Sequence, residues 1–151
     1  MILMKRKGFG KKFRFIEEIA TADIAFEAYG SNENELFENA ALAIEEITID
    51  TSNVKPKVKK KIRVEAAELD KLLFDFLSEL VYFKDADALV FSSFKVLIKK
   101  NKTYKLEAQV AGERFDAKPN ELRDDIKAIT WHMFRLEQTP KGWKCRIVVD
   151  V

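Results

Sequence analysis

Strand-like runs occupy most of the second half of this 151-residue sequence. In the last run Trp143, Cys145, Ile147 and Val149 alternate with Lys144, Arg146, Val148 and Asp150, as in a strand whose two faces differ. The four runs are residues 89–99, 104–111, 127–137 and 143–151. Turns containing Asn101-Lys102 and Pro140-Lys141-Gly142 join the members of two pairs. Such short connections predict a largely antiparallel sheet.

Two segments of the first half carry apolar residues at helical spacing instead. One follows Asn32 and Glu35, which form a plausible capping pair. The other begins near Glu68. Strands are expected at residues 23–29 and again after Pro56. The expected fold class is α+β, a two-layer sandwich with two main helices on one face of a mostly antiparallel sheet.

Length and composition fit one packed domain, because 151 residues with 47% apolar content can bury a sizeable core. We expect residues 1–12 to form a mobile basic arm and residues 13–151 a single domain. The longest apolar runs are too short to span a bilayer, and Met1–Met4 with Lys5 behind it does not resemble a signal peptide. The expected location is therefore cytoplasmic. A single cysteine and a single histidine give no disulfide and no zinc pattern.

Positive charge is concentrated in two runs, although the net charge is only +2. Residues 5–14 and residues 55–63 each contain six basic side chains. Such runs can follow a phosphate backbone. A solvated strand face that discourages aggregation explains the same residues. The sequence leaves both interpretations open.

Few residues are candidates for a catalytic or metal-binding role. Asp150 and the α-carboxylate of Val151 would lie side by side at the end of the last strand, where their repulsion calls for a cation or a basic group nearby. Asp23 opens an earlier strand and becomes relevant only if the fold brings it to Asp150. Lys127 has the ordinary interpretation of an exposed lysine, and His132 that of a core or half-buried side chain. No nucleophile, base and acid form a set, so the sequence does not predict an enzyme.

Several short motifs, taken in order, resemble the archease family from about Phe13 to the last residue. They are Thr21-Ala-Asp-Ile24, Glu27-Ala-Tyr-Gly30, residues 36–43, residues 72–80, Lys127-Ala-Ile-Thr130 and Ile147-Val-Val-Asp-Val151. The resemblance implies a two-layer α+β fold and a divalent-metal site at Asp23, Asp150 and the Val151 carboxylate. It also places Lys127 close to that site.

The resemblance further implies a function. Archeases are non-catalytic activators that promote guanylylation and multiple turnover of the tRNA-splicing ligase of the RtcB type. Family histidines are replaced here by Ala20 and Asn120, which leaves an all-oxygen site suited to Ca²⁺, or to Mg²⁺. An RNA-binding chaperone acting through the basic runs is the alternative. A metal-dependent phosphoesterase is a weaker third hypothesis, because three carboxylates without a general base or a second metal are insufficient evidence for such an active site.

Overall fold

The computed structural model describes residues 12–16 and 23–151. Apart from Lys12, the expected basic arm lies outside the described residues. Seven strands and two long helices are found in these described residues. The strands are β1 (Phe13–Ile16), β2 (Asp23–Gly30), β3 (Val58–Ala66), β4 (Leu89–Lys100), β5 (Tyr104–Arg114), β6 (Ala128–Thr139) and β7 (Gly142–Asp150). The helices are α2 (Glu33–Thr48) and α3 (Leu69–Asp87), with short 3-10 turns η1 (Thr51–Asn53), η2 (Phe115–Ala117) and η3 (Pro119–Glu121).

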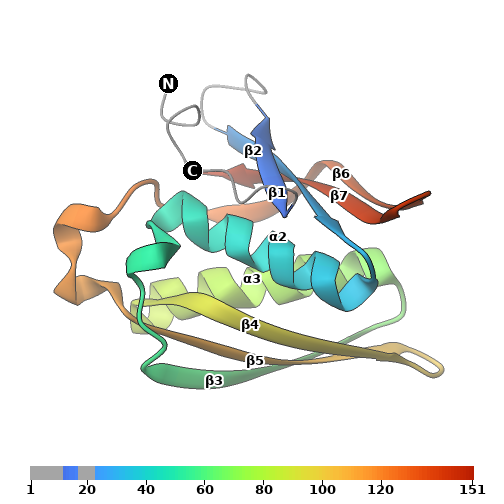
Figure 1. Cartoon of the computed structure of the whole chain (residues 1–151), viewed down its shortest axis with the longest axis horizontal. Helices are drawn as coiled ribbons and strands as arrows, with labels where there is room; N and C mark the ends of the chain where they lie inside the picture. Colours follow the sequence, from blue (N-terminus) through green and yellow to red (C-terminus); the bar gives the residue numbers. More distant parts are fainter. Residues whose placement is uncertain (1–11, 17–22) are drawn as a thin grey trace.

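The strands form two antiparallel sheets with the helices between them (Figure 1). One sheet has the order β1-β2-β7-β6 and the other β3-β5-β4. Helix α2 contacts β2 and β4, and helix α3 contacts β3 and β6, so each helix touches both sheets. The α+β class, the two helices and the antiparallel pairing are confirmed.

The number of sheets differs from the single sheet expected. The reason lies in the helices, which are buried on more than one side. Ten of the sixteen residues of α2 are buried, more than one apolar stripe would require. A second sheet covers the surface that one sheet would leave exposed. Among the described residues, no helix is long and apolar enough to cross a membrane.

The start of α2 follows the capping pattern expected from the sequence. Asn32 Oδ1 accepts the backbone N–H of Glu35 at 2.9 Å. Glu35 Oε1 accepts in return the backbone N–H of Ser31 at 2.8 Å. One free N–H group of the first turn and one just before the N-cap residue are thus satisfied by side chains, which fixes where the helix begins.

The end of α2 is capped by a distant segment, residues 122–124. The last carbonyl groups of a helix have no partner within it. Here the Glu46 carbonyl accepts from Arg123 Nη1 at 2.8 Å. The Ile47 carbonyl accepts from the Asp124 N–H at 3.1 Å, and the Thr48 carbonyl from the Arg123 N–H at 2.8 Å. The chain leading to Lys127 is therefore anchored to α2.

The strand expected at residues 127–137 is confirmed as β6, but its alternation is interrupted. Thr130 pairs with Val148 and Arg135 with Arg146, so five steps along β6 match two along β7. Met133, inside this irregularity, has a φ of 53°. His132 is exposed, so the expectation of a core or half-buried histidine was wrong. An irregular register of this kind disrupts the period-two pattern from which faces are assigned.

A carboxyl group buried in the core, Glu45, gives the fold a pH dependence. Burial raises its pKa to about 8, although the Phe91 N–H and the charge of Lys84 act in the opposite direction. The folded state holds this proton while the unfolded chain releases it near 4.5. Stability from this group is therefore complete below about pH 4.5 and declines up to about pH 8, by at most about 1.4 kcal/mol per pH unit.

Glu45→Gln should remove that decline, because glutamine keeps the shape and the acceptor for the Phe91 N–H but carries no charge. Urea unfolding at several pH values between 5 and 9 measures the effect. The exposed Glu68→Gln change is the matched control and should retain the wild-type profile. A Glu45→Gln profile that parallels the wild type would contradict the assignment.

Candidate functional site

Asp23 and Asp150 lie directly opposite each other on neighbouring strands. Asp23 is the first residue of β2 and pairs in register with Asp150, the last residue of β7. Directly opposed residues have Cβ atoms roughly 4.5–5.5 Å apart. Their neighbours Ile24 and Val149 belong to the core, so both carboxylates are on the sheet face turned away from the helices. Two carboxylates that are 127 residues apart in the sequence thus meet at one end of this sheet.

Lys127 reaches the same place through its backbone. Its N–H donates to the Asp150 carbonyl at 2.8 Å, just before β6 begins. Ala128 pairs with Asp150, so continuing the register by one residue puts Lys127 opposite Val151. The Lys127 side chain is exposed, whereas Val151 is half-buried against the core. The four residues singled out in the sequence therefore gather at one end of the four-stranded sheet.

The donor set at this end suits a hard cation. Carboxylate oxygens are the ligands that Ca²⁺ and Mg²⁺ prefer. Within residues 12–16 and 23–151, no three His, Cys, Asp or Glu side chains converge in a way that could hold a metal. A cation here would rest on the two aspartates, the terminal carboxylate, and water or a partner's groups. Of the two replaced family histidines, Asn120 is exposed on η3, and Ala20 lies outside the described residues.

A second charged cluster lies on the same face and was not anticipated from the sequence. Glu27, buried in the middle of β2, forms ion pairs with Arg14 at 2.8 Å and with Arg146 at 3.3 Å. Tyr29 donates its hydroxyl to the same carboxylate at 3.0 Å. Burial alone would raise the Glu27 pKa, but the Tyr29 and Arg146 hydrogen bonds and the Arg14 charge hold it below 4.5.

This cluster ties three strands together rather than extending the aspartate pair. Arg14 is on β1, Glu27 on β2 and Arg146 on β7. Asp23 and Glu27 are four residue steps apart along β2, a distance of about 13 Å. Alternation shows that Asp23 and Glu27 share one face of β2, and separately that Arg146 and Asp150 share one face of β7. Only the register between β2 and β7 shows that these two faces coincide.

Comparisons with known proteins agree with the motifs. Residues 13–151 match the model of the Archease protein family (MTH1598/TM1083). Protein archease of Methanosarcina barkeri is 38% identical over 144 residues, covering 94% of this chain and 97% of the relative. Protein archease of Sulfurisphaera tokodaii is 39% identical over 142 residues, covering 93% and 99%.

Two solved structures share the fold. The solution structure of Methanobacterium thermoautotrophicum protein 1598 superposes with a TM-score of 0.81 at 35% identity, covering 93% of this chain and 99% of that one. The crystal structure of an archease and possible chaperone from Thermotoga maritima has a TM-score of 0.61 at 20% identity, covering 87% and 93%. The second likeness concerns the fold alone.

Proposed function

The chain belongs to the archease family, and on this premise we propose that it is a non-catalytic protein cofactor of the tRNA-splicing RNA ligase of the RtcB type. It promotes guanylylation of that ligase and so sustains multiple turnovers. The observation that carries the proposal is the pairing of Asp23 with Asp150 beside the Lys127 backbone. This acidic end of the sheet is the surface that acts on the ligase.

A divalent cation, Ca²⁺ or alternatively Mg²⁺, is part of the proposal. Asp23, Asp150 and the α-carboxylate of Val151 would hold it, and when bound it would offset phosphate charge during nucleotide transfer. Two like charges directly opposite each other in a sheet repel, and a cation removes that repulsion. The exposed Lys127 side chain would contact an anionic group of the ligase or of its nucleotide.

The covalent steps belong to the ligase in this proposal. Carboxylates and an exposed lysine can position a cation and a phosphate, or favour one conformation of a partner. They do not form the nucleophile and base pair that a covalent step needs. The protein therefore acts on nucleotide loading, and joining of RNA by ligase that already carries its nucleotide should proceed without it.

The test compares two ligation assays with and without the protein. One follows a single turnover from pre-guanylylated ligase, and the other follows many turnovers from unmodified ligase with GTP. Stimulation confined to the second assay supports the proposal. Equal stimulation of both would move the role to the RNA-joining step and favour the RNA-chaperone alternative.

Lys127→Ala should separate function from stability. Because the side chain is exposed and only its backbone N–H holds Asp150, the change should cost no more than about 0.5 kcal/mol of unfolding free energy. Stimulation of multiple turnover should nevertheless fall sharply. Lys141→Ala, at an exposed lysine in the β6–β7 turn, is the control. Full stimulation by a folded Lys127→Ala protein would show that this lysine has no role.

A further inference from the structure

The outward face of the three-stranded sheet, which we call the basic face, is rich in positive charge. The register of β3, β5 and β4 aligns every second side chain in cross-strand rows that point away from the helices. Six of these side chains are basic: Lys59, Lys61, Arg63, Lys95, Lys99 and Lys105. Two are acidic: Glu65 and Glu107. The face thus has four net positive charges, whereas the whole chain has a net charge of +2.

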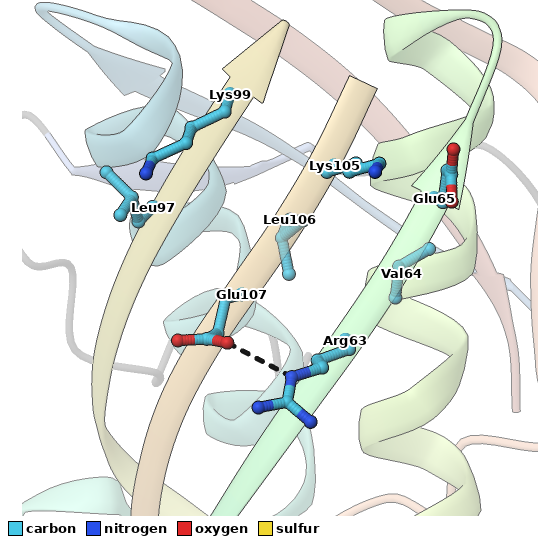
Figure 2. Close-up of a pocket in the computed structure, with 8 residues that line it drawn as sticks. All are labelled: Arg63, Val64, Glu65, Leu97, Lys99, Lys105, Leu106 and Glu107. Carbon is cyan, nitrogen blue, oxygen red and sulfur yellow. Dashed lines mark hydrogen bonds and ion pairs between the residues drawn. The ribbon is translucent and has the colours of Figure 1, made fainter. Parts of the chain in front are cut away.

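The described residues leave most of this charge without an ion-pair partner. Glu107 pairs with Arg63 at 3.0 Å and lies 4.0 Å from Lys61. Figure 2 shows the Arg63–Glu107 pair at one end of a depression of about 540 Å³, with Lys99 and Lys105 at its other end. A second depression, of about 440 Å³, continues past Lys59 and Lys95. Within the described part of the chain, the other four basic residues of the face make no ion pair (Lys59, Lys95, Lys99 and Lys105).

Protection of a sheet edge explains basic residues on β3, which is an edge strand, but not those on β4 and β5. Edge strands often carry lysine because it prevents pairing with another chain. The edge of β4, however, is already covered, since Glu38 accepts the Val96 N–H and Asn34 the Ile98 N–H, both at 2.9 Å. Lys105 lies on β5, the central strand, where there is no edge to protect. The charge that Lys95, Lys99 and Lys105 add to this face therefore needs another explanation.

We propose that the basic face binds the phosphate backbone of duplex RNA. Unpaired lysines on a strand surface supply the sequence-independent attraction on which phosphate contacts depend. A protein-binding surface would have aromatic or apolar residues at its centre and few lysines. The large apolar side chain that this face exposes is Leu97, at 50%. Its outward positions in β3, β4 and β5 hold no aromatic ring, so it lacks the stacking platform of single-strand binders.

The basic face and the aspartate pair are on different sheets. The helix layer separates the three-stranded sheet from the sheet that carries Asp23 and Asp150 (Figure 1). A bound duplex would leave the acidic end free, so one molecule could hold RNA and contact the ligase together. The choice of RNA over DNA rests on the proposed function, whereas attraction to a phosphate backbone follows from the charge alone.

The experiment measures binding of a fluorescent 20-base-pair RNA duplex to the protein alone at several salt concentrations. Affinity of the wild type should fall steeply with salt. The triple variant Lys59→Gln, Lys95→Gln, Lys99→Gln should bind at least about tenfold more weakly, and its salt dependence should shrink by about one unit per lost contact. Among the described residues the three lysines have no ion-pair partner, so the melting temperature should change little.

A second triple variant provides the control. Lys71→Gln, Arg135→Gln and Lys141→Gln remove three exposed charges away from this face and should bind RNA like the wild type. Equal weakening by both variants would mean a net-charge effect and would overturn the assignment, as would wild-type binding without salt dependence. If the basic-face variant loses affinity for the ligase and keeps its affinity for RNA, the face docks protein and the proposal is wrong. Because no ligase enters the RNA assay, its result is independent of the activator role.

Discussion

Asp23→Asn and Asp150→Asn should each abolish the effect of Ca²⁺ on the protein and reduce stimulation of multiple-turnover ligation by more than about tenfold. Both side chains are half-buried at one end of the four-stranded sheet and oppose each other in register. Asparagine preserves the size of the side chain and removes the charge that would hold the cation. Metal binding and stimulation should therefore be lost together.

The same substitutions have an opposite effect on stability when no cation is present. Like charges directly opposite each other destabilise a sheet, by roughly 0.2–1 kcal/mol. Asparagine at either position should thus leave the protein as stable as the wild type in chelator, or slightly more stable. Added Ca²⁺ should raise the wild-type melting temperature, because a ligand that binds only the folded state stabilises it by mass action. It should leave both variants unchanged.

Thermal unfolding in chelator and in Ca²⁺ measures this reversal without any ligase. Asp87→Asn, at an exposed residue at the end of α3, removes the same charge elsewhere and should respond to Ca²⁺ like the wild type. Two added residues after Val151 should weaken the Ca²⁺ response by displacing the terminal carboxylate. A Ca²⁺ response that survives in both aspartate variants would place the cation elsewhere.

The two carboxylates show what the sequence can and cannot predict. The β2 and β7 strands are recognisable from alternation, and so is the side of each strand on which its aspartate lies. Their pairing is a contact between the two ends of the domain, and no local pattern encodes a register of that range. The family resemblance supplied the connection that periodicity could not.

The basic face and the β6 irregularity were missed for related reasons. Lys59, Lys61 and Arg63 belong to a run visible in the sequence, but Lys95, Lys99 and Lys105 join them only through the register of β4 and β5. In β6 both Ile129 and Leu136 pack on the core across the displaced register, so alternation counted back from Leu136 fails at His132, which is exposed. Trp131 of this segment stacks on Phe74 of α3, with 4.2 Å between the ring centroids. This tertiary contact competes with regular pairing of β6 to β7.

The anchor of the 122–124 segment should be among the most sensitive points of the fold. Glu46 is fully buried and pairs with Arg123 at 2.8 Å. Arg123→Met would leave this carboxylate without its charged partner, at a cost of about 3–5 kcal/mol. For a chain of this size that corresponds to a fall in melting temperature of very roughly 6–20 °C.

A double change separates the buried charge from the lost packing. In the wild type the Thr51 hydroxyl donates to Glu46 Oε2 at 2.8 Å. Glu46→Gln keeps an oxygen that can accept this hydrogen bond and removes the charge that Arg123 neutralises. Combined with Arg123→Met it should recover much of the stability that Arg123→Met alone loses. Arg114→Met, at an exposed arginine paired with Asp116, is the control and should leave the melting temperature nearly unchanged. Strictly additive losses at Glu46 and Arg123 would show that the two side chains do not act as a pair.

The functional consequence follows from the path of the chain. The Arg123 side chain also donates to the Glu46 carbonyl, so Arg123→Met removes one of the three hydrogen bonds that hold residues 122–124 to the end of α2 and leaves the two backbone ones. Lys127, only four residues further on, is held by its N–H to Asp150 and by the burial of Ile126 beside it. We expect the weaker anchor to disturb the position of Lys127 but not that of the two aspartates. Well below its melting temperature, the Arg123→Met protein should bind Ca²⁺ through its intact aspartates while stimulating the ligase less. Stimulation equal to the wild type at that temperature would mean that the β6–β7 pairing alone positions Lys127.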